Sequence, residues 1–317
     1  MSKYKEYDMK DQKRYKMADR RSLVNSEQFA GVGRSDINDF LQFIPNILKG
    51  KDFKELLDVT FQAYKDKKPI LVGIGGHVIK TGMSPLFIEM MRLKAIQGVC
   101  CNGSVVIHDF EISCFGQTSE DVAEAIEDGS FGMSSDTCDS INDIISAGVK
   151  DELGYGEAIG KYLSENQLLH PELSLLRNAY EMNVPVTVHV ALGTDITHQH
   201  SGASGAAIGD LSMRDFRIFA ESVSQLDSGG VFICFGSTVI LPEVFLKALT
   251  ICRNKGKSVK NFTTAVFDMN YHYRPYVNIT NRPVQKNGKG YYFIGHHEIM
   301  IPLFMLSLRE RILNNET

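Results

Sequence analysis

The chain has 317 residues, of which 43% are hydrophobic, so it can bury a substantial core as one large α/β domain or two smaller ones. Its 34 basic and 38 acidic residues give a formal net charge of -4, which is too small to attract nucleic acid or an acidic membrane by bulk field. We therefore expect a small-molecule ligand and neither a nucleic-acid nor a membrane partner.

The cysteines and the hydrophobic runs favour a cytoplasmic protein. The six cysteines show no Cys-x-x-Cys spacing, and no apolar run reaches the roughly 18 residues of a membrane span. Residues 1–24 are polar and rich in Lys and Arg, without the hydrophobic centre of a secretory signal. We expect a cytoplasmic location with reduced thiols, and a charged N-terminal arm over residues 1–35 ahead of a single α/β domain over residues 36–317.

Strand-like and helix-like patterns alternate from residue 68 onward. A buried strand over 69–74 runs into a glycine-rich turn, and Ser84 and Pro85 are typical of the N-cap and first position of the following helix. The next buried strand is expected over 98–109, and an acidic first turn opens a helix over 118–126. The middle of the chain, residues 131–183, has apolar spacing near 3.6 and is expected to be helical. Further strands are expected over 184–192, 229–236, 262–269 and 290–294, and further helices over 213–226, 241–254 and 298–312.

This alternation predicts an α/β fold. Strands that are nearly continuous apolar runs indicate a doubly wound, mostly parallel sheet of Rossmann type with helices on both faces. Ligands of such sheets bind outside the carboxyl ends of the strands. The polar groups that follow strand ends are Gly75, Gly76 and His77; residues 102–109; residues 193–200; Gly236 and Ser237; and residues 268–272.

The stretch NGSVVIHDFE suggests proton transfer. Asn102 and Ser104 lie in a small-residue turn, and His108 and Asp109 follow an apolar run. A His next to an Asp can act as an oriented general acid or base, so both are candidate catalytic residues. The alternative is that the two residues cap a helix that begins at Phe110.

The stretch VHVALGTDITHQH holds three histidines and an aspartate. His189 falls inside the expected strand, where a hydrogen-bonded core histidine is the common outcome. Asp195 falls at the strand end, where a carboxylate can bind ribose hydroxyls or a substrate ammonium. His198 is a candidate proton carrier. Alternatively, Asp195, His198 and His200 are a ligand set for zinc or another divalent ion.

Charged residues gather again near the C-terminus. Arg274 is a candidate for binding a substrate carboxylate, because its guanidinium donates to two oxygens at once. His296 or His297, followed by Glu298, opens the last expected helix. We take His296 and Glu298 with Arg274 as candidate substrate-binding residues.

The order of these segments resembles the deoxyhypusine synthase family of NAD-dependent enzymes, over about residues 65–310. The resemblance is carried by the stretches ILVGIGGHVIKTGMSPLFIEMM, CNGSVVIHDFE, NVPVTVHVALGTDI, FICFGSTVILPEVF, TTAVFDMN and HHEIMIPLF. It implies a nicotinamide site at the strand ends and a homotetramer. The residues we expect to bind NAD are Gly75, Gly76, Asn102, Gly103, Ser104, Asp195, Gly236 and Ser237.

One departure from the family bears on the substrate. The family's Gly-Ser-Asp-Ser-Gly-Ala segment and its imine-forming lysine are replaced by NYHYRPYVNITNRPVQKNGKGYYF, whose lysines, Lys286 and Lys289, lie in a turn-like stretch. A Schiff-base lysine needs burial to lower its pKa. We therefore expect an NAD-dependent enzyme that acts on a small amine or amino acid by hydride transfer through an imine. The alternatives are a metal-dependent hydrolase that uses His198, His200 and Asp195, or a non-catalytic NAD-binding protein.

Overall fold

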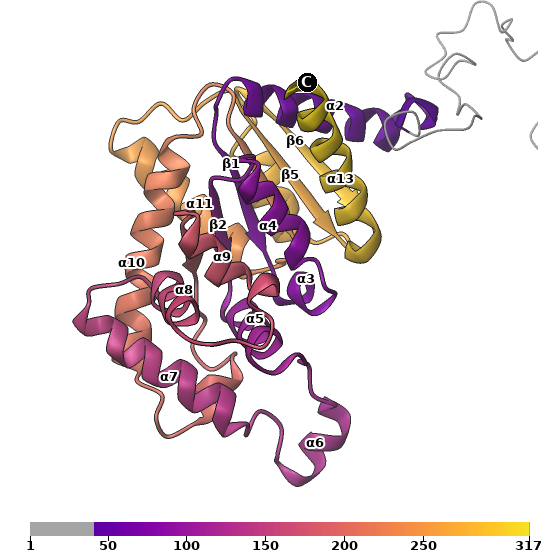
Figure 1. Ribbon diagram of the computed structural model, residues 1–317. Helices are drawn as coiled ribbons and strands as arrows, with labels where there is room; N and C mark the ends of the chain where they lie inside the picture. Colours follow the sequence, from indigo (N-terminus) through magenta and orange to yellow (C-terminus); the bar gives the residue numbers. More distant parts are fainter. Residues whose placement is uncertain (1–40, 317) are drawn as a thin grey trace, which may run out of the picture.

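A computed structural model describes residues 41–316, so the expected arm over residues 1–35 lies outside the described residues. Within residues 41–316, six parallel strands form one sheet with helices on both faces, as expected (Figure 1). The strands are β1 (Ile70–Ile74), β2 (Gly98–Cys101), β3 (Val186–Val188), β4 (Val231–Phe235), β5 (Phe262–Asp268) and β6 (Gly288–Ile294).

The helices lie between and around these strands. They are α2 (Leu48–Lys65), α3 (Gly76–Lys80), α4 (Ser84–Arg92), α5 (Gly103–Phe115), α6 (Val122–Asp128), α7 (Ser135–Lys150), α8 (Tyr155–Glu165), α9 (Leu175–Glu181), α10 (Gly205–Ser224), α11 (Ile240–Asn254), α12 (Tyr273–Pro275) and α13 (His297–Glu316). Two short 3-10 helices, η3 (Pro171–Leu173) and η4 (Ile196–Gln199), and a π-helix, η5 (Tyr276–Asn281), lie between these elements. None of the helices in this part of the chain is long and apolar enough to cross a membrane.

The strand order fixes where ligands bind in such sheets. The order is β3-β2-β1-β4-β5-β6, so the chain builds outward from β1 to β3 and then returns to place β4 beside β1. The topological switch point therefore lies between β1 and β4. Register confirms the neighbours: Ile70 pairs with Val231 in the β1–β4 ladder and Val99 pairs with Val186 in the β2–β3 ladder.

Side chains alternate between two hydrophobic layers. In β4, Ile233 and Phe235 pack on one face, which α2, α4 and α13 cover, whereas Phe232 and Cys234 pack on the other, which α11 and the C-terminal part of α10 cover (Figure 1). This alternation follows from the period of two along a strand. Every residue of β1, β2 and β4 is buried, which explains why these strands are continuous apolar runs in the sequence.

Several expected boundaries are wrong. The stretch 98–109 is not one strand, because β2 ends at Cys101 and α5 begins at Gly103. Val105, Val106 and Ile107 are all buried, and a short apolar run fits a buried helix as well as a buried strand. Consequently His108 and Asp109 lie within a helix instead of following a strand.

Other differences are smaller. Ser84 is the first residue of α4, and Met83 occupies the N-cap position expected for Ser84. Residues 131–183 contain α7, α8 and α9 with breaks between them, so the helix expected throughout is interrupted. The strand expected over 184–192 is only Val186–Val188 long.

Candidate functional site

Glycines at the strand ends let polar side chains lie against the backbone. A β-carbon on Gly76, which follows β1, would lie 2.4 Å from the Oγ of Ser104. A β-carbon on Gly103, which follows β2, would lie 1.9 Å from the Oδ2 of Asp195. Any larger residue at Gly76 or Gly103 would therefore displace Ser104 or Asp195. The structure brings Ser104, from the end of β2, and Asp195, from beyond β3, to the same edge of the sheet.

The turn between β2 and α5 is ordered by its own side chains. Asn102 is the N-cap residue of α5 and has extended backbone angles. The Oγ of Ser104 donates to the Oδ1 of Asn102 at 2.9 Å, so both predicted residues face the same turn.

The switch point between β1 and β4 is tightly packed. The N–H of Gly75 donates to the carbonyl of Phe235 at 2.9 Å, and a β-carbon on Gly75 would lie 2.2 Å from the oxygen of Gly236. Gly236 has φ +67, in the left-handed region that glycine adopts without strain. The Oγ of Ser237 accepts from the N–H of Leu241 at 3.3 Å and so helps to begin α11.

His297 is the histidine that reaches the switch point. A β-carbon on Gly236 would lie 2.4 Å from its Cε1, and its ring centroid is 5.7 Å from that of His77. His297 is 1% exposed, and its buried Nδ1 has no hydrogen-bond partner within residues 41–316. Burial is the largest influence on the pKa of His297, and it lowers this pKa. Asp268, at the end of β5, has a buried Oδ2 that likewise lacks a partner in this part of the chain.

The other C-terminal candidates are exposed. His296 is 68% exposed, with its Nδ1 3.8 Å from a carboxylate oxygen of Glu298. Arg274 is 54% exposed, and its Nε lies 3.5 Å from a carboxylate oxygen of Glu243. Sequence reasoning left His296 and His297 as alternatives, and only His297 packs against a strand-end glycine.

A cavity of about 270 Å³ opens at the ends of β2 and β3. Three of the predicted residues, Ser104, His108 and Asp195, lie in its wall. Two carboxylates and one cation that sequence reasoning missed also line it: Glu111, Glu120 and Lys80. They come from α5, the segment before α6, and α3, and no local pattern indicated that they would meet.

His108 faces this cavity as a neutral base. Its Nδ1 lies 2.7 Å from the Oγ1 of Thr118. Its pKa is lowered mainly by burial, and to a smaller extent by electrostatic repulsion from Lys80 and His77. An imidazole with a lowered pKa is uncharged at neutral pH and can accept a proton.

Asp109 turns away from His108, so the expected His–Asp pair is not formed. Its carboxylate accepts from the hydroxyl of Ser174 at 2.7 Å and from the N–H groups of Leu175 and Leu176 at 2.6 and 3.2 Å. These donors belong to the first turn of α9, whose free N–H groups need an acceptor. Burial raises the pKa of Asp109 to about 6. Asp109 does not cap a helix beginning at Phe110 either, since α5 begins at Gly103.

His198 is oriented by the backbone around Asp195. Its Nδ1 accepts from the N–H groups of Gly193 and Asp195 at 3.1 and 3.3 Å. A neutral ring that accepts at Nδ1 carries its hydrogen on Nε2, and this atom is 3.9 Å from the Oδ2 of Asp195. Burial raises the pKa of Asp195, and the nearby His198 opposes that shift.

The alternative metal set of Asp195, His198 and His200 is not formed. The Nε2 of His200 lies 2.8 Å from the carbonyl of Gly132, and its Nδ1 lies 3.4 Å from Asp139, away from the other two side chains. No group of three or more His, Cys, Asp or Glu side chains within residues 41–316 has the arrangement of metal ligands.

His189 is a core residue, as expected. It is 4% exposed, its Nε2 lies 3.1 Å from the Oγ1 of Thr187, and its ring packs edge-on against Phe219. Burial lowers its pKa to about 3.

Comparison with known proteins supports the fold in outline. No family model and no curated protein sequence matches the chain. The chain is similar in structure to a putative deoxyhypusine synthase from Entamoeba histolytica, with a TM-score of 0.51 and 11% identity over 86% of this chain and 92% of that one. Because the sequence identity is only 11%, this similarity shows a shared fold and nothing further.

Two larger proteins share the fold as well. One is ArgZ, an arginine dihydrolase of the ornithine–ammonia cycle in cyanobacteria, with a TM-score of 0.51 and 13% identity over 83% of this chain and 33% of that one. The other is AgrE in its ternary complex with ornithine and NAD+, with a TM-score of 0.52 and 11% identity over 84% of this chain and 34% of that one. The chain spans about a third of the length of these two proteins.

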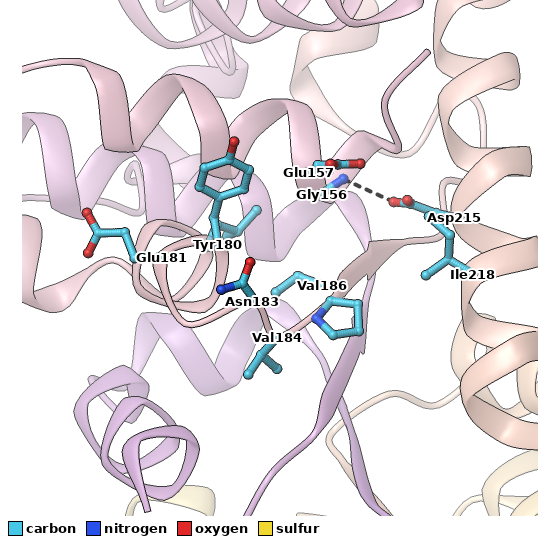
Figure 2. A pocket seen from close by; sticks show the side chains of 11 residues that line it. Gly156, Glu157, Tyr180, Glu181, Asn183, Val184, Val186, Asp215 and Ile218 are labelled. Atoms are coloured by element: carbon cyan, nitrogen blue, oxygen red, sulfur yellow. Dashed lines mark hydrogen bonds between the residues drawn. The ribbon is translucent and has the colours of Figure 1, made fainter. Parts of the chain in front are cut away.

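A second cavity, of about 560 Å³, lies at the other end of β3 (Figure 2). Asp215 of α10 lines it, and its Oδ2 accepts from the N–H groups of Gly156 and Val188 at 3.0 and 2.6 Å. The carboxyl group thus covers the free edge of β3 and the start of α8 at once. Burial raises the pKa of Asp215 to about 7. None of the predicted site residues lines this cavity, so we place the candidate site at the carboxyl edge.

Proposed function

We propose that the chain is an NAD-dependent enzyme that acts on a small amine or amino acid by hydride transfer through an imine. The observation that carries the proposal is the convergence of Ser104, His108 and Asp195 on one cavity at the carboxyl edge of a doubly wound sheet, at the ends of β2 and β3 and next to the β1–β4 switch point by one strand. Dinucleotides bind across the switch point in such sheets. The similar AgrE structure contains NAD+ and ornithine, which is consistent with this assignment.

The residues at the switch point fit a dinucleotide. His297 Nδ1 and Asp268 Oδ2 are buried polar atoms without a partner in residues 41–316, and such atoms favour a ligand that supplies the missing hydrogen bonds. We assign the cofactor to Gly75, Gly76, Asn102, Gly103, Ser104, Asp195, Gly236 and Ser237. NAD, when bound, would take up a hydride from the substrate carbon.

Asp195 helps to orient the cofactor in this proposal. Its carboxylate lies against Gly103 at the start of α5, a helix end that otherwise attracts anions. Because a carboxylate there repels phosphate and accepts hydrogen bonds from hydroxyls, we assign Asp195 to a ribose and the pyrophosphate to the Gly236–Ser237 turn.

The cavity wall suits a cationic substrate. The carboxylates of Glu111 and Glu120 attract an ammonium group, and neutral His108 can take a proton from the substrate nitrogen as the imine forms. His198 is a second candidate proton carrier. Arg274, His296 and Glu298 follow the ends of β5 and β6, across the switch point from this cavity, and their expected role in substrate binding stays a prediction.

Calorimetric titration of the purified chain with NAD tests the proposal. We expect a dissociation constant in the micromolar range, and weakening by about tenfold in Asp195→Asn, which corresponds to the loss of one charge-assisted hydrogen bond. Asp210→Asn is the matched control, because Asp210 is an exposed carboxylate of α10. Absence of NAD binding to the wild-type chain contradicts the proposal.

Turnover separates an enzyme from a non-catalytic NAD-binding protein. Ornithine, arginine and putrescine are each incubated with the chain and NAD while the absorbance of the reduced nicotinamide is followed. Reduction with any of them supports the enzyme. Binding of NAD without reduction by any small amine or amino acid supports the non-catalytic alternative.

A further inference from the structure

A hydroxyl group joins His108 to a carboxylate of the cavity wall. The Oγ1 of Thr118 lies 2.7 Å from His108 Nδ1, and the same hydroxyl donates to the Oε2 of Glu111. His108 and Glu111 are three residues apart on α5, so they lie on the same face of the helix. Gly116 ends α5 with φ +72, and this left-handed turn returns Thr118 to that face.

Glu111 is held from a second side. The hydroxyl of Thr137, on α7, donates to the Oε1 of Glu111 at 3.1 Å. Thr137 is buried and also accepts from the hydroxyl of Ser134 at 3.3 Å. Each carboxylate oxygen of Glu111 therefore accepts a threonine hydroxyl, which fixes the side chain in place.

The donors and acceptors along this chain of hydrogen bonds have one consistent direction. A threonine hydroxyl carries a single hydrogen, and a carboxylate only accepts. Thr118 gives its hydrogen to Glu111, so its oxygen must accept from His108. A neutral imidazole has one N–H group, and in His108 this group is therefore Nδ1–H. The lone pair of His108 is then on Nε2.

His108 lies in the cavity wall with its Nε2 unoccupied by the described residues. His108 lines the cavity together with Lys80 of α3 and Asp195, and no hydrogen bond within residues 41–316 occupies its Nε2. A β-carbon on Gly76 would lie 3.3 Å from the neighbouring Cδ2, so the glycine leaves room for this side of the ring. The charged or titratable groups that face His108 are Lys80 and His77 of α3, Glu111 of α5, Glu120, and Asp195.

We propose that Thr118 and Glu111 are positioning residues that hold His108 with its hydrogen on Nδ1, so that Nε2 accepts a proton from the substrate nitrogen. The proposal rests on the proposed function. We call the hydrogen-bonded chain from His108 through Thr118 to Glu111 the relay. In the step, a substrate N–H bond breaks and its proton moves to Nε2. The electrons of that bond form the second bond of C=N, and the hydrogen on the adjacent carbon leaves with both electrons of its C–H bond as a hydride, which NAD, when bound, would accept.

Nitrogen NMR of the full chain labelled with 15N-histidine tests the relay without a substrate. Comparison with His108→Gln assigns the two ring nitrogens of His108, and their chemical shifts show which one carries hydrogen. At a pH where the ring is neutral, we expect hydrogen on Nδ1. Hydrogen on Nε2 in the wild-type chain overturns the proposal, whatever the Thr118 variants show.

Three variants sharpen the test. Thr118→Val removes the hydroxyl at nearly constant volume, so we expect His108 to shift toward the form with hydrogen on Nε2. Thr118→Ser keeps the hydroxyl and should restore the wild-type signal. Thr250→Val is the control, since the Thr250 hydroxyl donates only to its own helix, α11, at 2.7 Å. An unchanged His108 signal in Thr118→Val refutes the role of Thr118.

The same samples distinguish failure of the relay from failure of the proposed function. NAD is titrated into the wild-type and Thr118→Val chains. NAD binding together with the wrong tautomer refutes the relay alone. The expected tautomer without NAD binding refutes the cofactor assignment, and with it the catalytic use of the relay.

Discussion

Replacing Asp215 with Asn tests whether this buried carboxyl group is uncharged in the folded chain. Its Oδ2 accepts two backbone N–H groups, from Gly156 and Val188, and burial raises its pKa from 3.8 to about 7. Asparagine keeps an oxygen that can accept both hydrogen bonds but cannot ionise. The substitution therefore removes the titration with little change in shape.

The size and sign of the effect follow from the two pKa values. The folded-state pKa is higher than the unfolded-state pKa, so the folded chain binds more protons between the two values. The resulting stabilisation is fully present below about pH 3.8 and is lost as the pH rises through about 7. For one such group, the free energy of unfolding falls by about 3 kcal/mol between about pH 5 and about pH 8.

Urea unfolding across that pH range measures this fall. The difference between wild type and Asp215→Asn cancels the other titrating groups, so we expect it to change by about 3 kcal/mol in favour of the variant as the pH rises. Asp210→Asn, on the exposed side of α10, should follow the wild-type curve. Parallel curves for wild type and Asp215→Asn would refute the reasoning.

Four further outcomes are expected. Asp109→Ala leaves the Ser174 hydroxyl and two N–H groups of α9 without an acceptor, so urea unfolding should show a loss of about 3 kcal/mol while calorimetry shows unchanged NAD affinity. His108→Gln should lower the initial rate of NAD reduction by about a hundredfold or more without changing NAD affinity, and an unchanged rate would remove His108 from the mechanism. Gly103→Ala should displace Asp195 and weaken NAD binding by about tenfold, whereas Gly209→Ala, with nothing within 4 Å of the new β-carbon, should not. Light scattering should give the mass of a tetramer, as the family resemblance implies, and a monomer at all concentrations would contradict it.

The strand-end rule predicted much of the candidate site. Ser104 and Asp195 were expected near one another because parallel strands end at a common edge, and the structure places both in one cavity wall. The rule can be applied from the position of each strand in the sequence, without knowledge of which residues each side chain contacts.

Partners that are distant in sequence could not be predicted. Asp109 meets Ser174 only because α5 and α9 pack together, and nothing near Asp109 in the sequence indicates this. His108 was expected after a strand, and only its true place on α5 brings Glu111 to the same face. His296 and His297 are neighbours in sequence, and only the folded structure shows that His297 is buried against Gly236 while His296 is exposed.

The position of β1 in the sheet has a consequence for how the chain folds during synthesis. Ile70 pairs with Val231, so one side of this central strand stays without a partner until β4 has left the ribosome. Over that interval β1 presents a row of unpaired backbone groups flanked by apolar side chains, which is the kind of edge that recruits other chains. A fragment that ends before β4 should therefore aggregate. In the complete sheet, β4 pairs with β1 and covers this edge.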